Sequence, residues 1–416
     1  MDTPRSNPGK LLVLGHQWPE AGATAAGQRM LQLLRGFREA GYHITFGCAA
    51  ERTPMATPLE PLGVETRSLR LNHDSFDSFL REHRFDIALF DRFMTEEQFG
   101  WRVRDQLPDC TLVLDTEDLH SLRHSREKAL REGRLWKPSA WMEDPLFYRE
   151  LASILRADLT LIISRDEMDL MLDHLPFLED ILCYLPFRFP TPDLAEAPGY
   201  EEREGLVFIG NGRHRPNLDA ISVLKKEIWP LLSKRLTGVT LHVYGAYLPE
   251  KILAFHRPAE RFEVHGWIPD TGTVLEKHRL QLAPLRFGAG VKGKILDAIQ
   301  NGLPSVSTPI GWEGILREAA AKDFQAADPE AFCRKAEALY RDPEAWRRAL
   351  QAQYRAAAPH FGTSMEAFIK LLQEPGGQSK APGATLKVLR AMLRHQAFDR
   401  VRYLSRWIEA KEGRGN

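Results

Sequence analysis

One short segment, residues 284–294, combines glycines and basic side chains in a pattern that suits anion binding. Its members are Arg286, Gly288, Gly290, Lys292, Gly293 and Lys294. Glycine lets the backbone approach a ligand closely, and free N–H groups at the start of a helix favour anions. An apolar run at residues 280–285 leads into the segment, and a helical pattern at residues 291–301 follows it, with Gly302 as its C-terminal cap. The simplest ligand for such a site is a phosphate or a diphosphate.

Two other interpretations of this segment stay open. Residues 288–293 match GxGxxG, the fingerprint of dinucleotide-binding sites, but a lone match is weak. A nicotinamide site also needs an acid about 20 residues on, at the end of a second strand. Here the next predicted strand, residues 304–308, ends in Ser307 and Thr308, and Glu313 follows only in the next loop. The second alternative is a plain strand-to-helix turn with solvated lysines.

Polar groups that could act on a hydroxyl follow two predicted strands in the first half of the chain. The strand at residues 111–114 is followed by Asp115, Glu117, Asp118 and His120. A carboxylate or imidazole there could orient or deprotonate an acceptor hydroxyl. The structural alternative is that these residues cap the next helix. His16 and Gln17 follow the first strand in the same way, whereas His265 lies inside a strand pattern and is interpreted as structural.

Short apolar runs alternate with helical patterns along the whole chain, which is typical of an α/β fold with parallel sheets covered on both faces. Helices are predicted at residues 25–40 and 217–235. Residues 189–204 are rich in proline and acids, without periodicity, and are predicted to be an interdomain linker. The sequence therefore predicts two doubly wound, Rossmann-like domains, residues 10–188 and 205–374. Strand C-termini from both domains would face one cleft.

The bulk composition excludes several classes of protein. The 416 residues need two domains, and 56 Lys and Arg balance 56 Asp and Glu, which argues against a nucleic-acid partner. The polar start, residues 1–10, is neither a signal peptide nor a membrane span. Four widely spaced cysteines indicate reduced thiols and no zinc site. A cytoplasmic location is the expectation from these features.

The C-terminal tail is predicted to be a separate helical element at residues 384–412. A Gly- and Pro-containing break, residues 375–383, precedes it, and Lys and Arg outnumber Asp and Glu beyond that break. Apolar residues from Leu386 to Ile408 lie roughly on one side of the helix. A basic amphipathic helix can lie on an anionic membrane surface, here the inner face of the plasma membrane. The alternative is that the helix packs on its own domain or on another subunit.

Three segments, in this order along the chain, carry a resemblance to a known family. Residues 115–120 read Asp-Thr-Glu-Asp-Leu-His, and residues 208–212 read Phe-Ile-Gly-Asn-Gly, before Arg-Pro-Asn-Leu-Asp-Ala at 215–220. Residues 284–308 follow Pro-Leu-x-x-Gly-x-Gly-x-Lys-x-Lys-Ile-Leu-acid-Ala-x-x-x-Gly-x-Pro-x-Val-x-Thr. The chain resembles retaining glycosyltransferases with the GT-B fold, of the large bacterial family 4 (group 1) type. Within that family it resembles the branch with the Gly-x-Gly-x-Lys-x-Lys donor loop, over most of residues 10–370.

The resemblance implies a sugar transfer from a nucleotide-diphosphate sugar to a hydroxyl of a glycan or a lipid-linked saccharide, with retention. The donor would bind mainly to the C-terminal domain and the acceptor mainly to the N-terminal one. No metal and no further cofactor would be needed, and the sequence indeed lacks an Asp-x-Asp motif that could hold a metal on a diphosphate. Cationic side chains and helix N-termini can stabilise the diphosphate instead.

Roles follow from the resemblance residue by residue. The expected donor-binding residues are Gly210, Asn211, Arg213, Arg215, Gly266, Trp267, Ile268, Arg286, Gly288, Gly290, Val291, Lys292, Lys294 and Asp297. Asp297 would accept hydrogen bonds from the ribose hydroxyls, where the family usually carries Glu. The expected catalytic residues are Asp118, His120 and Lys292, and the expected acceptor-binding residues are His16, Gln17, Gly22 and Asp115.

One departure from the family pattern leaves two rival functions open. Many relatives carry a second, sugar-facing glutamate eight residues before the ribose-binding acid, and here that position is Ala289. The named branch commonly lacks this glutamate. Ala289 and the shortened Asp297 allow a degenerate, non-catalytic glycosyltransferase that serves as a binding subunit. A nucleotide-sugar epimerase with the same fold is the other alternative.

Overall fold

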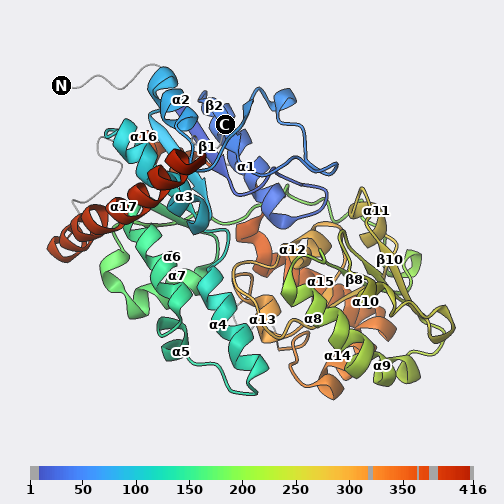
Figure 1. The fold of residues 1–416 in the computed structure, drawn as a ribbon. Helices are drawn as coiled ribbons and strands as arrows, with labels where there is room; N and C mark the ends of the chain where they lie inside the picture. Colours follow the sequence, from blue (N-terminus) through green and yellow to red (C-terminus); the bar gives the residue numbers. More distant parts are fainter. Residues whose placement is uncertain (1–8, 317–321, 363–364, 374–382, 413–416) are drawn as a thin grey trace.

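The computed structural model describes residues 9–316, 322–362, 365–373 and 383–412. Two α/β domains pack against each other, and each has a central parallel sheet between layers of helices (Figure 1). The predicted fold class is therefore confirmed.

The N-terminal domain contains a seven-stranded sheet in which every strand pairs in parallel, in the order β3-β2-β1-β4-β5-β6-β7. Its strands are β1 (Lys10–Gly15), β2 (His43–Cys48), β3 (Glu65–Ser68), β4 (Ile87–Asp91), β5 (Thr111–Asp115), β6 (Leu159–Ile162) and β7 (Leu182–Tyr184). Its helices are α1 (Ala25–Glu39), α2 (Ser75–His83), α3 (Phe93–Gln106), α4 (His120–Arg131), α5 (Pro138–Met142), α6 (Pro145–Arg156) and α7 (Arg165–His174). The central strands are buried on both faces, as their unbroken apolar runs predict.

The C-terminal domain contains a five-stranded parallel sheet in the order β10-β9-β8-β11-β12. Its strands are β8 (Leu206–Ile209), β9 (Leu241–Tyr244), β10 (Phe262–Gly266), β11 (Leu280–Ala283) and β12 (Ser305–Ser307). Its helices include α8 (Arg215–Val223), α9 (Trp229–Arg235), α10 (Glu250–Leu253), α11 (Gly272–Leu275), α12 (Gly293–Gln300), α13 (Pro309–Trp312), α14 (Pro329–Arg341) and α15 (Pro343–Ala357). Beyond β12, Ser307 and Gln325 form an isolated parallel bridge.

The single helix predicted at residues 217–235 is interrupted. A π-helical turn, Leu224–Ile228, separates α8 from α9. Pro230 lies in the first turn of α9, and proline has no N–H group and its ring clashes with the carbonyl four residues earlier. The wider π turn accommodates this missing hydrogen bond without ending the helical segment.

The second half of the linker is fixed to the C-terminal domain. The Arg203 guanidinium is almost fully buried and donates hydrogen bonds to the carbonyls of Pro198, Leu275, His278 and Asn301. A guanidinium with several fixed donors suits this convergence of carbonyl groups. The last residues of the linker predicted at residues 189–204 are therefore part of the C-terminal domain.

The chain returns to the N-terminal domain after α15. Helix α16 (Glu366–Gln373) places Phe368 and Ile369, with the preceding Met365, in a core cluster of the N-terminal domain, where Phe368 contacts Phe37 edge-to-face. The C-terminal domain thus ends before residue 365, and not at residue 374 as the sequence predicted. A helix with one apolar face needs a partner surface, and the sequence does not say which domain provides it.

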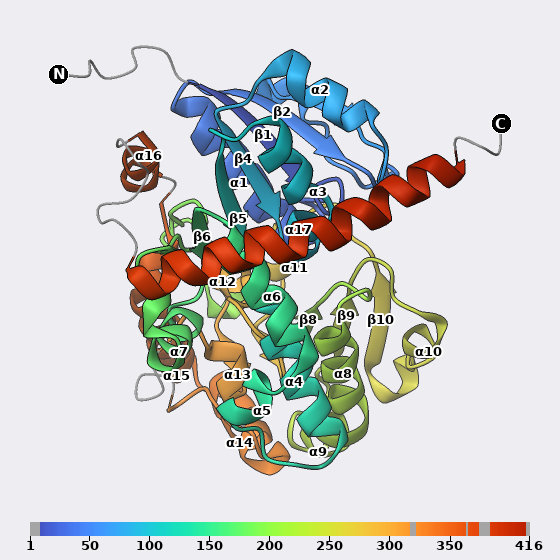
Figure 2. The same ribbon diagram turned by 60° about the vertical axis from the view of Figure 1, so that its left-hand side comes forward.

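Helix α17 (Ala384–Glu412) lies across α3 and α6 of the N-terminal domain (Figure 2). Leu386 is buried in the core of that domain, and Arg390 donates to the Ala157 carbonyl and pairs with Asp158 at 2.6 Å. Near the other end of the helix, the Arg102 guanidinium donates to Ser405 and Glu409. The described part of the tail therefore packs on its own chain. None of the described helices is both long enough and apolar enough to span a membrane.

Candidate functional site

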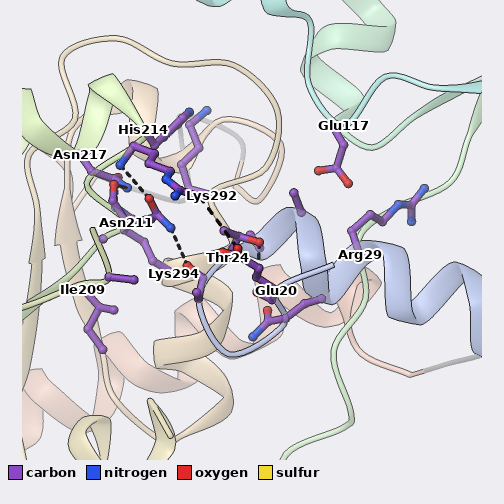
Figure 3. A pocket seen from close by; sticks show the side chains of 18 of the residues that line it. Glu20, Thr24, Arg29, Glu117, Ile209, Asn211, His214, Asn217, Lys292 and Lys294 are labelled. Atoms are coloured by element: carbon purple, nitrogen blue, oxygen red, sulfur yellow. Dashed lines mark hydrogen bonds and ion pairs between the residues drawn. The ribbon is translucent and has the colours of Figure 1, made fainter. Parts of the chain in front are cut away.

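A cavity of about 620 Å³ lies between the two domains. Its walls come from the loops after β1 and β5 of the N-terminal domain and from the loops after β8, β10 and β11 of the C-terminal domain. The carboxyl ends of parallel strands in both sheets therefore face this cleft, which is where α/β proteins bind ligands. Figure 3 shows Asn211, His214 and Lys294 on one side of the pocket and Glu117 on the other.

The glycines of the β11–α12 loop are required by the opposite domain. Gly290 has a φ of 64°, and a Cβ atom there would lie 2.8 Å from the Cβ of Asp118. At Gly293 a Cβ atom would lie 2.9 Å from the Cβ of Ala25. Both positions therefore exclude larger residues because the loop presses against the N-terminal domain. The sequence predicted close approach to a ligand, and the close neighbour in the structure is protein.

The N–H group of Gly290 already has a partner. It donates to Oε1 of Glu167 at 2.7 Å, and the Leu119 N–H donates to the same oxygen at 2.9 Å. Glu167 thus joins the glycine loop to the loop after β5. Burial, followed by the nearby charge of Asp118, raises the pKa of Glu167 to about 8. The Gly290 N–H, expected to bind the diphosphate, is therefore engaged in the interdomain contact.

Lys292 and Lys294 both line the cleft. The Lys292 ammonium donates to the Gly290 carbonyl at 2.9 Å and lies 3.7 Å from Glu313, and burial lowers its pKa. The Lys294 ammonium donates to Oδ1 of Asn217 and lies over the Phe208 ring, and burial lowers its pKa to about 7. Since burial disfavours the charged amine, a bound anion would restore the positive charge on Lys294.

The neighbouring donor-domain residues are held by contacts across the cleft. Asn211 donates from Nδ2 to the Ala23 carbonyl at 3.1 Å, and the Trp267 indole donates to the Gly22 carbonyl at 3.3 Å. Both residues line the cavity, together with Gly210, Arg213, Ile268, Gly288 and Val291. Gly266 and Gly290, which were also expected to bind the donor, do not line the cavity. The loop that carries the predicted acceptor-binding residue Gly22 is thus in direct contact with the predicted donor-binding residues Asn211 and Trp267.

Asp297, the expected ribose ligand, also lines the cleft. Its Oδ2 accepts a hydrogen bond from the Thr271 hydroxyl at 2.9 Å, and burial raises its pKa to about 6. The carboxylate is therefore oriented by α11 before any ligand binds.

Two basic residues that the sequence assigned to the donor site lie outside the cavity. Arg215 pairs with Glu127 at 2.7 Å, and Arg286 pairs with Asp219 on α8. Neither residue lines the interdomain cleft, and both border a smaller surface hollow. Their charges are therefore used in ion pairs on the outer side of the loops. Spacing alone could not tell these outward-facing residues from Lys292 and Lys294.

On the acceptor side, His16, Gln17, Gly22, Asp118 and His120 line the cleft. Burial would raise the pKa of Asp118, but the adjacent Arg123 and His120 outweigh it and hold that pKa well below its usual range. Burial lowers the pKa of His120 to about 3, so its imidazole is neutral near pH 7. Asp118 is thus an ion-pair partner of Arg123 rather than a free base.

Asp115 does not reach the cavity. Its side chain is fully buried and contacts the Arg29 guanidinium at 3.4 Å. The sequence placed Asp115 after the end of the strand. In the structure it is the last residue of β5, and it remains inside the sheet layer. Its carboxylate therefore orients Arg29, which lines the cleft.

The cleft residues to which the sequence gave no role include Glu20, Arg92 and His214, and Glu117 was named only as one candidate among the polar residues after β5. Glu117 and Arg92 have φ angles of 62° and 71°, which are uncommon for residues with side chains. Burial, followed by the charge of Asp115, raises the pKa of Glu117 to about 8, and its Oε1 has no hydrogen-bond partner within the described structure. Strained backbone and an unsatisfied buried carboxylate often mark functional positions. The sequence places a glutamate at position 117, but it does not predict the unusual backbone angle or the position of this residue in the cleft.

Ala289 packs against the N-terminal domain. Its methyl group belongs to the same core cluster as Leu119 and Leu122, and it is almost completely buried. The same residue also lines the cleft, so a methyl group lies where many relatives carry a glutamate. The alanine at this position, which departs from the family pattern, therefore packs against apolar residues of the N-terminal domain.

Comparison with known proteins agrees with this geometry. Residues 203–342 match the family model described as glycosyl transferases group 1, which covers most of the C-terminal domain. No curated protein sequence matches the chain.

Solved structures resemble the chain over both domains. The sucrose-phosphate synthase of Thermosynechococcus elongatus aligns at 13% identity over 86% of this chain and 96% of that one, with a TM-score of 0.61. HepE of Anabaena, in complex with UDP and glucose, aligns at 12% over 85% and 96%, with a TM-score of 0.60. A glycosyltransferase of Rickettsia africae aligns at 9% over 93% and 99%, with a TM-score of 0.57. These likenesses define the GT-B fold, and the matched domain supports a glycosyltransferase.

The buried Glu167 predicts a pH-dependent stability. Its raised pKa of about 8, against an ordinary value of 4.5 for a glutamate, means that the folded protein keeps a proton that the unfolded chain releases. This stabilising contribution is present below about pH 4.5 and is lost as the pH rises through about 8. Glu167→Gln keeps a neutral acceptor for both N–H groups. We therefore expect its free energy of unfolding to increase relative to wild type between pH 5 and 8, as measured by urea denaturation.

The control is Asp169→Asn, an exposed carboxylate on the same helix. The free energy of unfolding of this variant should depend on pH in the same way as that of wild type. Parallel profiles for Glu167→Gln and wild type would contradict the assignment of a buried, protonated carboxyl.

Proposed function

We propose that the protein transfers a sugar from a nucleotide-diphosphate sugar to a hydroxyl of a glycan or lipid-linked saccharide, with retention and without a divalent metal. The observation that carries the proposal is the combination of two lysines, the buried Lys292 and the half-buried Lys294, with the carboxylate of Asp297 in one interdomain cleft. The lysines suit a diphosphate, and the carboxylate suits ribose hydroxyls. The group 1 match spans this donor half, and HepE, with the same fold, was crystallised with UDP and glucose.

The proposed step forms a bond between the acceptor oxygen and the anomeric carbon of the donor. The bond from that carbon to the diphosphate oxygen breaks, and the acceptor proton passes to the leaving diphosphate. Attack from the side of the leaving group retains the configuration and needs no enzyme nucleophile. Lys292 and Lys294 would stabilise the charge that develops on the diphosphate. The contacts between Gly22, Trp267, Ala23 and Asn211 would hold both halves of the site in position and exclude water.

A nucleotide-release screen with a panel of nucleotide sugars and saccharide acceptors tests the proposal. We expect acceptor-dependent release of one nucleoside diphosphate. Lys292→Ala should lower donor binding or turnover roughly tenfold to a hundredfold, which equals about 1.5–3 kcal/mol for one charge-assisted contact.

Arg286→Ala is the matched control, because it removes one positive charge from the same loop but outside the cleft. Its turnover should stay within about twofold of wild type, since a surface ion pair contributes little. Equal effects of the two variants would show that the diphosphate lies elsewhere. Acceptor-independent conversion of the donor would instead indicate an epimerase, and no reaction with any donor a binding subunit.

Glu117 is the residue that we propose to orient the acceptor hydroxyl. It combines a cleft position, an open carboxylate oxygen and a pKa raised to about 8. Above about pH 8, where Glu117 is ionised, Glu117→Gln should lower kcat roughly tenfold, because a neutral amide oxygen accepts a weaker hydrogen bond from the acceptor hydroxyl than a carboxylate does. Nucleoside diphosphate affinity should stay within about twofold of wild type. Glu132→Gln, an exposed change at the C-terminal end of α4, should leave kcat unchanged. A Glu117→Gln variant with wild-type kcat would remove this role.

We further propose that the outer face of α17 contacts an anionic membrane, which would suit a lipid-linked acceptor. Tyr403, Leu404 and Trp407 are exposed there, and Arg406 and Lys411 lie beside them. Aromatic rings next to cations favour the membrane interface. Sedimentation should show more binding to vesicles with anionic lipid than to neutral ones.

The double variant Tyr403→Ser, Trp407→Ser should reduce this binding several-fold. The control is Leu135→Ser, Tyr148→Ser, which removes exposed apolar side chains elsewhere on the N-terminal domain. Equal sedimentation of the two double variants, or no wild-type binding to anionic vesicles, would contradict membrane contact through α17.

A further inference from the structure

Two histidines and a glutamate meet on the outer edge of the C-terminal sheet. His242 lies on β9, and Glu263 and His265 lie on the edge strand β10. The parallel register places Glu263 beside His242, and alternate residues of a strand share a face, so His265 projects on the same side as Glu263. None of the three lines the interdomain cleft. This cluster is therefore separate from the proposed donor site.

The three side chains direct one ligand-type atom each toward a common point. Nδ1 of His242 lies 2.9 Å from Nε2 of His265. Oε2 of Glu263 lies 3.4 Å from the same His265 nitrogen and 3.7 Å from the His242 nitrogen. A tetrahedral zinc ion with bonds of about 2.0–2.1 Å to nitrogen and oxygen separates its ligands by about 3.3 Å. The three observed separations lie on both sides of that value, so small rotations would complete the geometry.

The ligand types also suit a metal ion. Two imidazole nitrogens and one carboxylate oxygen face a common point, and imidazole nitrogen is the commonest metal ligand in proteins. In the absence of an ion, the two facing nitrogens can share only one proton. All three side chains are partly exposed, which leaves room for a water molecule as the fourth ligand.

The surrounding rings hold the histidines in place. Tyr244 stacks on His265 with ring centroids 4.6 Å apart, and His278 meets His242 edge-on at 4.9 Å. The His278 Nδ1 is hydrogen-bonded to the Val274 carbonyl, so this ring is oriented by α11. Ligand side chains that are fixed by their neighbours lose little freedom when an ion binds.

We propose that His242, Glu263 and His265 form a binding site for one divalent transition-metal ion, with zinc as the best fit to two imidazoles, one carboxylate and a water. This inference does not depend on the proposed sugar transfer. The bound ion would join the edge strand β10 to β9. Because β10 leads directly into Trp267 and Ile268 of the cleft wall, the ion would also stabilise that wall.

The test is titration of the full chain, without a polyhistidine tag, with cobalt(II) and then zinc(II). We expect one cobalt ion per chain with the visible absorption bands of tetrahedral coordination, displaced by zinc, and a rise in Tm with zinc. His265→Ala and Glu263→Gln should each weaken zinc affinity at least roughly tenfold and reduce the Tm rise.

His174→Ala, which removes an exposed histidine from the N-terminal domain, is the control and should bind as wild type does. Glu263→Gln preserves size and hydrogen bonding, and the Tm of each variant without metal shows whether it is folded. Absence of stoichiometric cobalt or zinc binding to wild type would overturn the proposal. Zinc affinity that is unchanged in folded Glu263→Gln and His265→Ala would do so too, because the ion would then bind elsewhere.

Discussion

The buried carboxyl group of Glu167 is the interaction on which the arrangement of the cleft depends. It accepts N–H groups from Leu119 of the N-terminal domain and from Gly290 of the C-terminal domain. The two loops can meet at this point only because Gly290 has no side chain. A second interdomain contact is the bidentate ion pair between Arg126 and Glu313. Arg126 also donates a hydrogen bond to the Gly288 carbonyl. The relative position of the two domains is therefore determined at the loop that carries the lysines.

This constraint has an electrostatic consequence for the cleft. Lys292 is buried in this loop and Lys294 is half-buried against Asn217 and Phe208, and removal from water makes a charged ammonium unfavourable. The negative charge of Glu313 offsets part of the effect of burial on the pKa of Lys292. For Lys294, burial lowers the pKa without such an offset. An anion that enters the cleft would relieve this cost. The cleft is thus prepared for negative charge before a ligand binds, which is the property that electrostatic catalysis requires.

The sequence predicted the features that are local, and it did not predict those that depend on the other domain. The apolar runs identified β1, β8 and β11, and the Gly-Lys segment identified the loop before α12. Glu167 lies in an ordinary helix, and nothing in its neighbours indicates that it bridges two loops. Arg286 and Lys292 have the same charge on the same loop, yet one pairs with Asp219 outside the cleft and the other lies within it. The return of α16 to the first domain has the same cause, since an apolar helix face does not specify its partner.

Binding of a nucleoside diphosphate to the resting protein tests the central claim most directly. Calorimetry at pH 8, in two buffers with different ionisation enthalpies, measures affinity and proton transfer together. We predict that one of UDP, GDP, ADP or TDP binds at one site per chain. We also predict that binding takes up a proton, because the phosphate restores the charge on Lys294, whose pKa is about 7 in the free protein. Absence of binding by all four nucleotides would contradict the account, and so would binding with the same proton uptake by Lys294→Met.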